Sequence, residues 1–403
     1  MVSVRRAAPV RRSDQVIVKF AVVSDAGLHE RRIRQVGGVS ARRSAFGSWY
    51  KVTLEPGISM GQALADFRAM PEVEYAEPNG ATWAAFSPDD EFFSDQWNFR
   101  LLNVTRMWDI QKGDPSVVVA IVDTGIAYED FGPFRKGPDW GNTVFVEGFN
   151  VLTGTSHAND DNFHGTHVAG TVAEGTDNRI AVAGMAFRCA LMPVKVLDAD
   201  GTGTDFDLAE GIRFASQHGA KVINLSLGGD ASETVRAAVD DAFRAGAVLV
   251  AAAGNESVGT VSFPAAYPNV IAVGAIDGSK QLAFYSNFGS ALDVVAPGGD
   301  LDRDDDGDGQ PDGVEQVTLD PDASAAGRYD EFVLLFVIGT SEATPHVSAL
   351  AALLVRQGIT DPAAVKAAIE STAEDLGTPG RDDRFGFGLI RPVEALKGLG
   401  LNQ

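Results

Sequence analysis

The fold of this chain is decided by a stretch of eight residues, Val118-Val119-Ala120-Ile121-Val122-Asp123-Thr124-Gly125. A short apolar run that ends in turn-forming residues is typical of a strand buried on both faces, as in parallel sheets. Asp123 follows this strand at its carboxyl end, the edge at which open parallel sheets gather their ligands. An aspartate at this place can also cap a strand-to-helix turn, so Asp123 alone does not establish a site.

The same rhythm continues along the chain and predicts the fold class. Apolar runs alternate with helical stretches, which predicts right-handed βαβ units and a mostly parallel, doubly wound sheet flanked by helices. We therefore expect a large α/β domain over residues 96–403. The expected strands are 117–122, 190–197, 221–225, 247–252 and 270–273, and the expected helices are 164–173, 205–218, 233–245, 341–356 and 362–371.

A second, smaller α+β domain is expected at residues 14–79, behind a basic tail at 1–13. Its predicted strands are 15–20, 48–54 and 73–79, and its predicted helix is 59–70. Residues 80–95 contain Gly80, Pro88 and a short acidic run without periodicity, so we expect a linker there.

The net charge of −22 is distributed unevenly. Residues 1–80 carry 12 Lys and Arg against 8 Asp and Glu, a balance of +4, so the remaining residues hold −26. This acidity favours solubility, and it can also attract the basic head electrostatically; both interpretations stay open. It argues against a nucleic-acid partner, because binding phosphates needs a positive face.

The cysteine count and the hydropathy exclude two further classes of protein, those held by internal disulfides and those that span a membrane by a helix. Cys189 is the single cysteine, which excludes an internal disulfide, and no apolar run reaches the roughly 18 residues of a membrane helix. We expect no membrane partner and a stability that comes from packing or metal ions. Residues 1–12 lack the apolar core of a signal peptide. We expect an extracellular protein whose signal segment is not in this sequence, with an intracellular location as the alternative.

Two further segments carry chemistry: His164-Gly165-Thr166-His167 and Gly339-Thr340-Ser341-Glu342. A serine hydroxyl becomes a nucleophile when a base takes its proton, and a neutral imidazole does so near pH 7. A buried carboxylate then fixes the imidazole tautomer. In chain order Asp123, His164 and Ser341 give Asp–His–Ser, the order found in subtilisins.

On these segments the chain resembles the subtilisin-like serine proteases (subtilases) over most of its length. The resemblance implies that Ser341 attacks a peptide bond, that His164 moves the proton and that Asp123 orients His164. It also implies that the side-chain amide of Asn255 completes an oxyanion hole with the Ser341 N–H. His167 and His346 are expected to be structural, because no further ligand follows at zinc-site spacing.

The resemblance also interprets the N-terminal part of the chain. Residues 14–79 are similar to subtilase propeptides, which have a ferredoxin-like fold and act as folding assistant and temporary inhibitor. The bond cut during maturation would then lie within about 78–95. An unrelated accessory domain is the alternative.

The substrate cleft is implied in the same way. Ser226, Leu227 and Gly228 match the segment that pairs with an extended peptide, a strand-addition mode of binding. Gly254, Glu256 and Ser262 match the surroundings of the first specificity pocket. The side chains of Glu256 and Ser262 indicate that this pocket tolerates polar or basic substrate side chains.

Glu342 departs from the family pattern, which usually has methionine after the nucleophile. A carboxylate near a developing oxyanion raises the barrier unless it is protonated or turned away. We therefore expect Glu342→Met to improve peptide turnover somewhere between pH 6 and 10.

An acidic insertion at about 300–316 predicts a calcium site. Residues 304–315 match D-x-D-x-D-G-x₅-E, whose spacing lets one loop supply the hard oxygens that Ca²⁺ needs. A solvated acidic loop is the alternative. The candidate ligands are Asp304, Asp306, Asp308, Gln310, Asp312 and Glu315.

A second calcium site follows from the resemblance alone. Residues 175–182 match a family loop that binds calcium through backbone carbonyls and one Asn side chain. The implied ligands are Gly175, Asn178, Ile180 and Val182, with carboxylates from Asp90 and Asp130.

Together these features predict a calcium-stabilised serine endopeptidase made as a zymogen and working as a monomer on peptides or proteins. A catalytically weak relative that acts as a calcium-dependent binding or surface module is the main alternative. An esterase with the same triad is a third reading, which the extended cleft segments disfavour.

Overall fold

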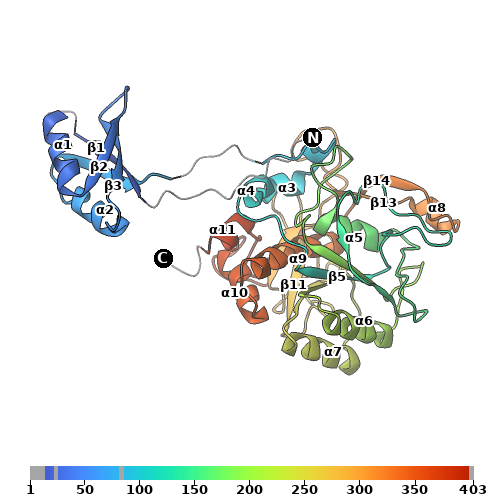
Figure 1. Cartoon of the computed structure of the whole chain (residues 1–403). Helices are drawn as coiled ribbons and strands as arrows, with labels where there is room; N and C mark the ends of the chain where they lie inside the picture. Colours follow the sequence, from blue (N-terminus) through green and yellow to red (C-terminus); the bar gives the residue numbers. More distant parts are fainter. Residues whose placement is uncertain (1–13, 22–25, 81–85, 399–403) are drawn as a thin grey trace. The chain divides into compact units, whose positions relative to one another are not determined.

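The computed structural model describes residues 14–21, 26–80 and 86–398 (Figure 1). The chain divides into two compact units, residues 1–84 and 85–403. The predicted basic tail at 1–13 and residues 81–85 of the predicted linker lie outside the described residues.

The first unit is a four-stranded antiparallel sheet with the order β2-β3-β1-β4. Its core contains Val16, Val18 and Phe20 from β1 and Phe67 from α2, all fully buried. The elements are β1 (Gln15–Phe20), α1 (Ala26–Gln35), β2 (Gly38–Arg43), β3 (Trp49–Leu54), α2 (Met60–Arg68) and β4 (Val73–Pro78).

The second unit is built on a sheet with the order β12-β11-β10-β9-β5-β8-β6, with β7 also paired to β8. Its strand pairings are parallel, which confirms the predicted fold class. The strands are β5 (Val118–Asp123), β6 (Val144–Phe145), β7 (Phe149–Asn150), β8 (Ala190–Lys195), β9 (Val222–Leu225), β10 (Val248–Ala252), β11 (Val270–Ile276) and β12 (Val294–Pro297).

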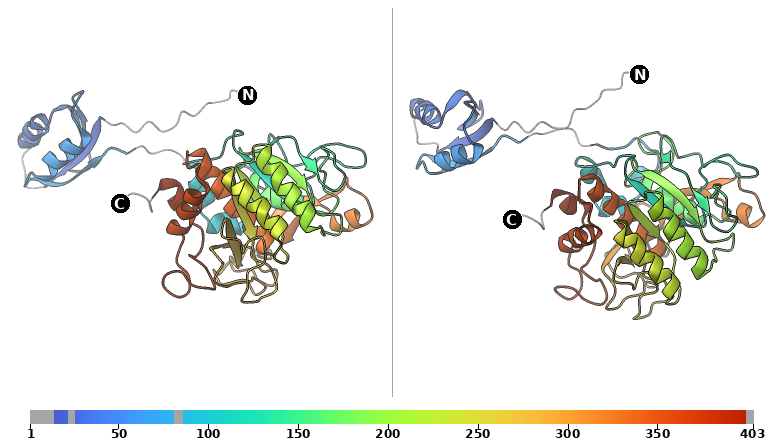
Figure 2. Two further views of the ribbon diagram at one scale, coloured as in Figure 1. Left: turned by 90° about the horizontal axis from the view of Figure 1, so that it is seen from below. Right: turned by 60° about the horizontal axis from the view of Figure 1, so that its bottom comes forward.

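Helices cover both faces of this sheet. The helices α5 (His164–Ala173) and α9 (Thr340–Arg356) pack together on one face, and α6 (Asp205–Gln217) and α7 (Glu233–Arg244) lie side by side on the other (Figures 1 and 2). Further helices of this unit are the 3₁₀ turn η1 (Phe93–Asp95), α3 (Trp97–Leu101), α4 (Val104–Trp108), α10 (Pro362–Thr372) and α11 (Pro392–Lys397).

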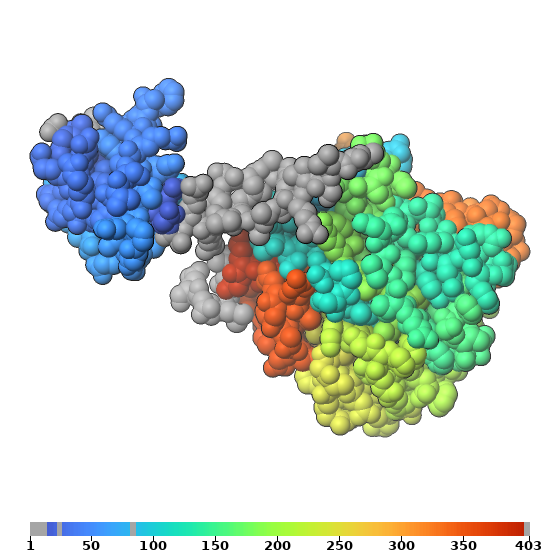
Figure 3. Space-filling model, viewed as in Figure 1, coloured from blue at the N-terminus to red at the C-terminus, as the bar shows by residue number. Residues whose placement is uncertain are grey.

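A β-hairpin that the sequence analysis did not predict packs against α5, although its second strand, Phe332–Val337, is an apolar run. It consists of β13 (Val314–Leu319) and β14 (Phe332–Val337), with the short helix α8 (Pro321–Ala325) between them. Figure 3 shows this insertion as an orange patch on the surface of the second unit. Glu315, Gln316 and Thr318 of β13 are buried, so the strand lacks the apolar run that reveals a buried strand in a sequence.

No helix among the described residues has both the length and the apolar character needed to cross a bilayer.

Candidate active site

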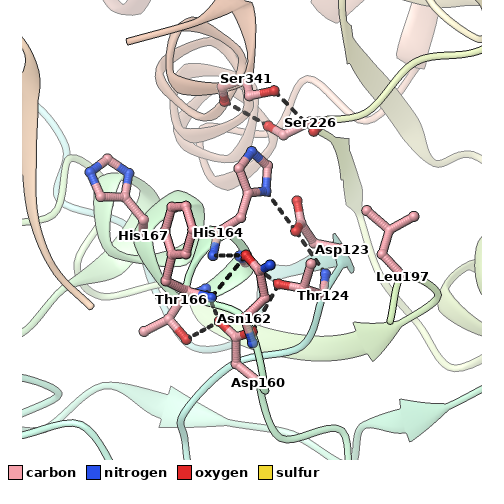
Figure 4. A network of polar contacts seen from close by, with 12 residues as sticks. Asp123, Thr124, Asp160, Asn162, His164, Thr166, His167, Leu197, Ser226 and Ser341 are labelled. Carbon is pink, nitrogen blue, oxygen red and sulfur yellow. Dashed lines mark hydrogen bonds and ion pairs between the residues drawn. The ribbon is translucent and has the colours of Figure 1, made fainter. Parts of the chain in front are cut away.

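The fully buried Asp123 is the last residue of β5 and lies directly beside His164, the first residue of α5 (Figure 4). Its Oδ1 lies 2.8 Å from His164 Nδ1 and accepts a hydrogen bond of 2.7 Å from the Thr124 N–H. A carboxylate accepts only, so the neutral His164 ring carries its proton on Nδ1 and leaves Nε2 as the base.

Beneath this pair lies a buried polar network that fixes the turn after β5. The Thr124 hydroxyl donates to Asp160 at 2.9 Å, and the Thr166 hydroxyl donates to the same carboxylate at 2.6 Å. The buried Lys195 ammonium donates to the Thr124 carbonyl and to Asp161, each at 2.7 Å. The sequence analysis missed these residues, although the acidic pair shortly before His164 was an available signal.

Ser341 is the second residue of α9 and is tied to the end of β9. Its hydroxyl donates to the Ser226 carbonyl at 3.1 Å, and the Ser226 hydroxyl donates to the Ser341 carbonyl at 2.7 Å. Proton transfer to His164 therefore requires the Ser341 hydroxyl to turn away from Ser226.

Asn255 follows β10 and is oriented by Thr340. Its Oδ1 accepts hydrogen bonds from the backbone N–H and the hydroxyl of Thr340, both at 2.9 Å, so its NH₂ group is left for another acceptor. A Cβ on Gly339 would lie 2.5 Å from Glu342 Oε2, 3.5 Å from this NH₂ nitrogen and 3.6 Å from the Ser341 backbone nitrogen. The two nitrogens thus lie beside Gly339, and the Glu342 carboxylate is closer to that point than either of them.

The electrostatics of the site favour a charged imidazole. Burial alone would lower the pKa of His164, but the charge and hydrogen bond of Asp123, with the charges of Glu342 and Asp160, raise it to about 9. Burial raises the pKa of Glu342, and the nearby His164 opposes that rise. The base is therefore protonated at neutral pH.

Two cavities flank the nucleophile. One, of about 640 Å³, is lined by Ser226, Leu227 and Gly228 together with His164. The other, of about 350 Å³, is lined by Leu227 and Gly228 and by Gly254, Asn255, Glu256, Ser262 and Ser341. All six residues predicted for the cleft and its pocket line these two cavities.

The second cavity has a polar wall organised by Asn287, which the sequence analysis missed. Its NH₂ group donates to Glu256 at 2.6 Å, and its carbonyl oxygen accepts from the Glu256 N–H at 3.1 Å. Gly254 has φ +106°, and a Cβ there would lie 2.3 Å from the Asn287 amide and 2.5 Å from the Ser262 hydroxyl. The pocket therefore needs glycine at this position.

Comparison with known proteins identifies this arrangement. Residues 114–388 match the model of the subtilase family, and residues 11–79 match that of the fervidolysin N-terminal prodomain. The chain belongs to the subtilase family. It is a subtilisin-like serine protease with an N-terminal prodomain, as its resemblance predicted.

Individual relatives support this assignment over nearly the whole chain. A thermophilic serine proteinase of Bacillus sp. (strain AK1) is 36% identical over 95% of this chain and 87% of its own length. Thermitase of Thermoactinomyces vulgaris is 35% identical over 73% of this chain and 94% of its own length. A protease structure from Pseudoalteromonas arctica has a TM-score of 0.67 at 31% identity and covers 77% of this chain and 99% of that one.

The predicted calcium loop of this subtilase brings some of its acids together. Carboxylate oxygens of Asp304, Asp306 and Asp308 lie within 4.8 Å of one another. The Asp304 carboxylate also accepts hydrogen bonds from the N–H groups of Gly307, Asp308 and Gly309. The Arg100 guanidinium contacts Asp306 and lies 3.8 Å from Asp308.

The other predicted ligands of this loop lie outside that group of three. Asp312 accepts from the Asp305 N–H at 2.7 Å, and the Gln310 N–H donates to Asp308. Glu315 stands on β13 with Oε2 buried and unpartnered, and burial together with the charges of Asp95 and Asp308 raises its pKa to about 8. A buried carboxylate oxygen without a hydrogen-bond partner is a group that a hard cation could satisfy.

The second predicted loop meets a different carboxylate. Asp90 accepts hydrogen bonds from the N–H groups of Asp177 and Asn178, so it lies next to the loop for which it was a predicted ligand. Asp130 instead accepts from the Lys136 N–H, whereas Asp139 accepts from the Asn178 side chain at 2.8 Å and from the Val182 N–H at 3.2 Å. Burial raises the pKa of Asp139 to about 7, and its contacts with Asn178 and Val182 place this missed residue, unlike Asp130, against the predicted loop.

Gly175 and Ile180 complete the predicted set around the same loop. The Gly175 N–H donates to the Asp139 carbonyl at 2.7 Å, and the Ile180 N–H donates to the Asn178 side chain at 2.8 Å. Buried acids beside amide and carbonyl oxygens form a donor set of the type that Ca²⁺ prefers.

Proposed function

We propose that this subtilase hydrolyses peptide bonds through an acyl-enzyme formed on Ser341. The observation that carries the proposal is the 2.8 Å contact between Asp123 and the Nδ1 of His164, which leaves Nε2 free to act as the base on the side of α9. The Asn255 amide nitrogen and the Ser341 backbone nitrogen both lie beside Gly339, which supports an oxyanion site there.

The steps follow from these roles. The Ser341 oxygen attacks the peptide carbonyl while its proton passes to His164 Nε2, and Asp123 stabilises the resulting imidazolium. Asn255 and the Ser341 N–H donate to the oxyanion, and the amine then leaves with the proton from His164. Water then attacks the ester while His164 takes its proton, and the Ser341 oxygen leaves with that proton from His164 as the acid is released.

The substrate is proposed to be an extended peptide. Gly229 exchanges two backbone hydrogen bonds with Phe263, at 2.8 and 3.1 Å, which holds the adjoining Leu227 and Gly228 along both cavities. A segment fixed in this way can pair with a peptide backbone by strand addition.

We further propose that residues 14–79 restrain the enzyme until the linker is cut, so that the protein is made as a zymogen. The match of residues 11–79 to the fervidolysin N-terminal prodomain supports this role. An extracellular location is proposed on kinship with the subtilases.

Calcium is proposed as a stabilising ion. The 304–308 carboxylates with Glu315 form one candidate site, and Asp90, Asp139 and Asn178 form the other. An ion that binds only the folded chain would stabilise it, which matters where no disulfide is possible.

One observation favours the second candidate, a catalytically weak binding module. Glu342 is buried beside His164, with its Oε1 4.0 Å from the ring Nε2, and a protonated His164 cannot act as a base. A fluorophosphonate probe separates the two proposals, because only a competent triad reacts at Ser341.

Mass spectrometry tests activity and maturation together. The unmodified protein should cleave itself between about 78 and 95, and the Ser341→Ala variant should stay intact. If the probe labels Ser341 but the chain is not cleaved, the proposed protease activity stands and the proposed zymogen is refuted. If the probe does not label Ser341 and the chain is not cleaved, the proposed protease activity is refuted.

A further inference from the structure

A buried carboxylate lies on the opposite edge of the catalytic imidazole from Asp123. Glu342 is 1% exposed, and its Oε1 has no hydrogen-bond partner. That oxygen lies 4.0 Å from His164 Nε2 and 4.0 Å from His167 Nδ1. A buried carboxylate without a partner is costly, so burial raises the pKa of Glu342, and a nearby positive charge is what can keep it ionised.

His167 cannot supply this charge. Its Nε2 faces two acceptors, the carbonyls of Val314 at 3.1 Å and Leu335 at 3.2 Å, so Nε2 carries the ring proton. The Nδ1 that faces Glu342 therefore has only a lone pair. Burial lowers the pKa of His167 to about 4, and the ring stays neutral in the working pH range of a protease.

The other titratable groups that face Glu342 in the described part of the chain are neutral or negative. Asp123 on β5 is an acid, and the Tyr285 hydroxyl after β11 donates to the Gly299 carbonyl, with a pKa that burial raises. His346, on the same helix, has a pKa that burial lowers to about 4. Among the described titratable groups that face Glu342, His164 is thus the one that can carry a positive charge.

We propose that Glu342 is a positioning residue that holds the protonated His164 ring at its Nε2 edge, and so competes with Ser341 for the nitrogen that must act as the base. The inference rests on the proposed function and goes beyond it by tying the activity to alkaline pH. The Ser341 hydroxyl, which donates to Ser226 and not to His164, agrees with this competition.

The direction of the effect follows from the charges. An opposite charge within about 4–6 Å favours the protonated ring and raises its pKa by about 1–3 units. Without Glu342 the acid limb of kcat/KM should move to lower pH by at least about one unit. Below that limb the fraction of neutral base rises about tenfold per unit, so kcat/KM at pH 7 should rise about tenfold. At pH 10.5, where the ring is already neutral, the change should stay within about twofold.

The experiment uses the full chain and two readouts. Glu342→Gln keeps the size and removes the charge, and Glu342→Met is the second variant should the first fail to fold. Glu370→Gln is the matched control, because it removes a partly buried carboxylate on α10. We would measure kcat/KM for a short chromogenic peptide from pH 6 to 11, and the rate of Ser341 labelling by a fluorophosphonate over the same range.

The expected result is a downward shift of the acid limb in both readouts for Glu342→Gln and Glu342→Met, and none for Glu370→Gln. An unchanged acid limb in a folded, active Glu342 variant would overturn the inference and leave the proposed function standing. Wild-type protein that labels at no pH would overturn both.

Discussion

Substituting Gly165 by alanine tests whether the contact between α5 and β5 holds the catalytic pair in place. Gly165 follows His164, and a Cβ at this position would lie 2.2 Å from the Gly125 carbonyl and 3.1 Å from the Asp123 carboxylate. Both obstacles belong to the turn that presents Asp123, and the nearer one is backbone.

The magnitude follows from these distances. Ordinary contacts of a Cβ begin at 3.4 Å, so α5 and the turn after β5 must separate by roughly 1 Å. Overpacking of this kind costs about 1–3 kcal/mol of stability. A displacement of 1 Å at a catalytic group costs about 10²-fold in rate, and the 2.8 Å contact between Asp123 and His164 should lengthen accordingly.

The assay is kcat/KM for a peptide substrate at pH 10, together with thermal unfolding in the Ser341→Ala background to prevent self-digestion. Gly259→Ala is the matched control, since its Cβ would meet the nearest atom, of Phe288, at 3.5 Å. Gly165→Ala with wild-type kcat/KM and unchanged Tm would show that the packing of α5 on β5 does not set the geometry of the pair.

Three further outcomes are expected. Asn255→Ala should lower kcat by about 10²–10³ with little change in KM, a magnitude known from a subtilisin; an unchanged kcat would remove Asn255 from the oxyanion site. Chelation of calcium should lower the Tm of the Ser341→Ala protein by about 5–10 °C, if free calcium stood near 100 times Kd, and the double variant Asp304→Asn, Asp306→Asn should respond less. Burial, with the charge of Asp293, raises the pKa of Glu370 to about 7. The folded state therefore binds this proton more tightly, its stability falls from about pH 4.5 to 7, and Glu370→Gln should lessen that fall in Tm measured against pH.

Most buried apolar runs were predictable from the sequence, and irregular polar segments were not. The runs that became β5 and β10 are buried except for the half-buried Val118, so their composition marks them, whereas the equally apolar run of β14 was overlooked. By contrast α1 buries only His29 and Ile33 among its ten residues, and β2 exposes all of its residues except Gly38. Neither carries the periodic apolar stripe on which a sequence pattern depends.

The residues of the candidate site also differ in how far the sequence could predict them. Asp123, His164, Ser341 and Asn255 stand in short motifs at element ends, and the structure brings Asp123 and His164 into contact, while the roles of all four stay predictions. Asp139 was missed because it belongs to a loop without a motif, and folding brings it to Asn178. The support given by Lys195 could not be predicted either, since it depends on a buried side chain that reaches another strand's turn.

The reciprocal hydrogen bonds between Ser226 and Ser341 give the cleft a mechanical link to the nucleophile. A peptide that pairs with the segment after β9 would bind next to the carbonyl that accepts the Ser341 hydroxyl, so the residue that adjoins the proposed substrate strand also sets the resting position of the nucleophile.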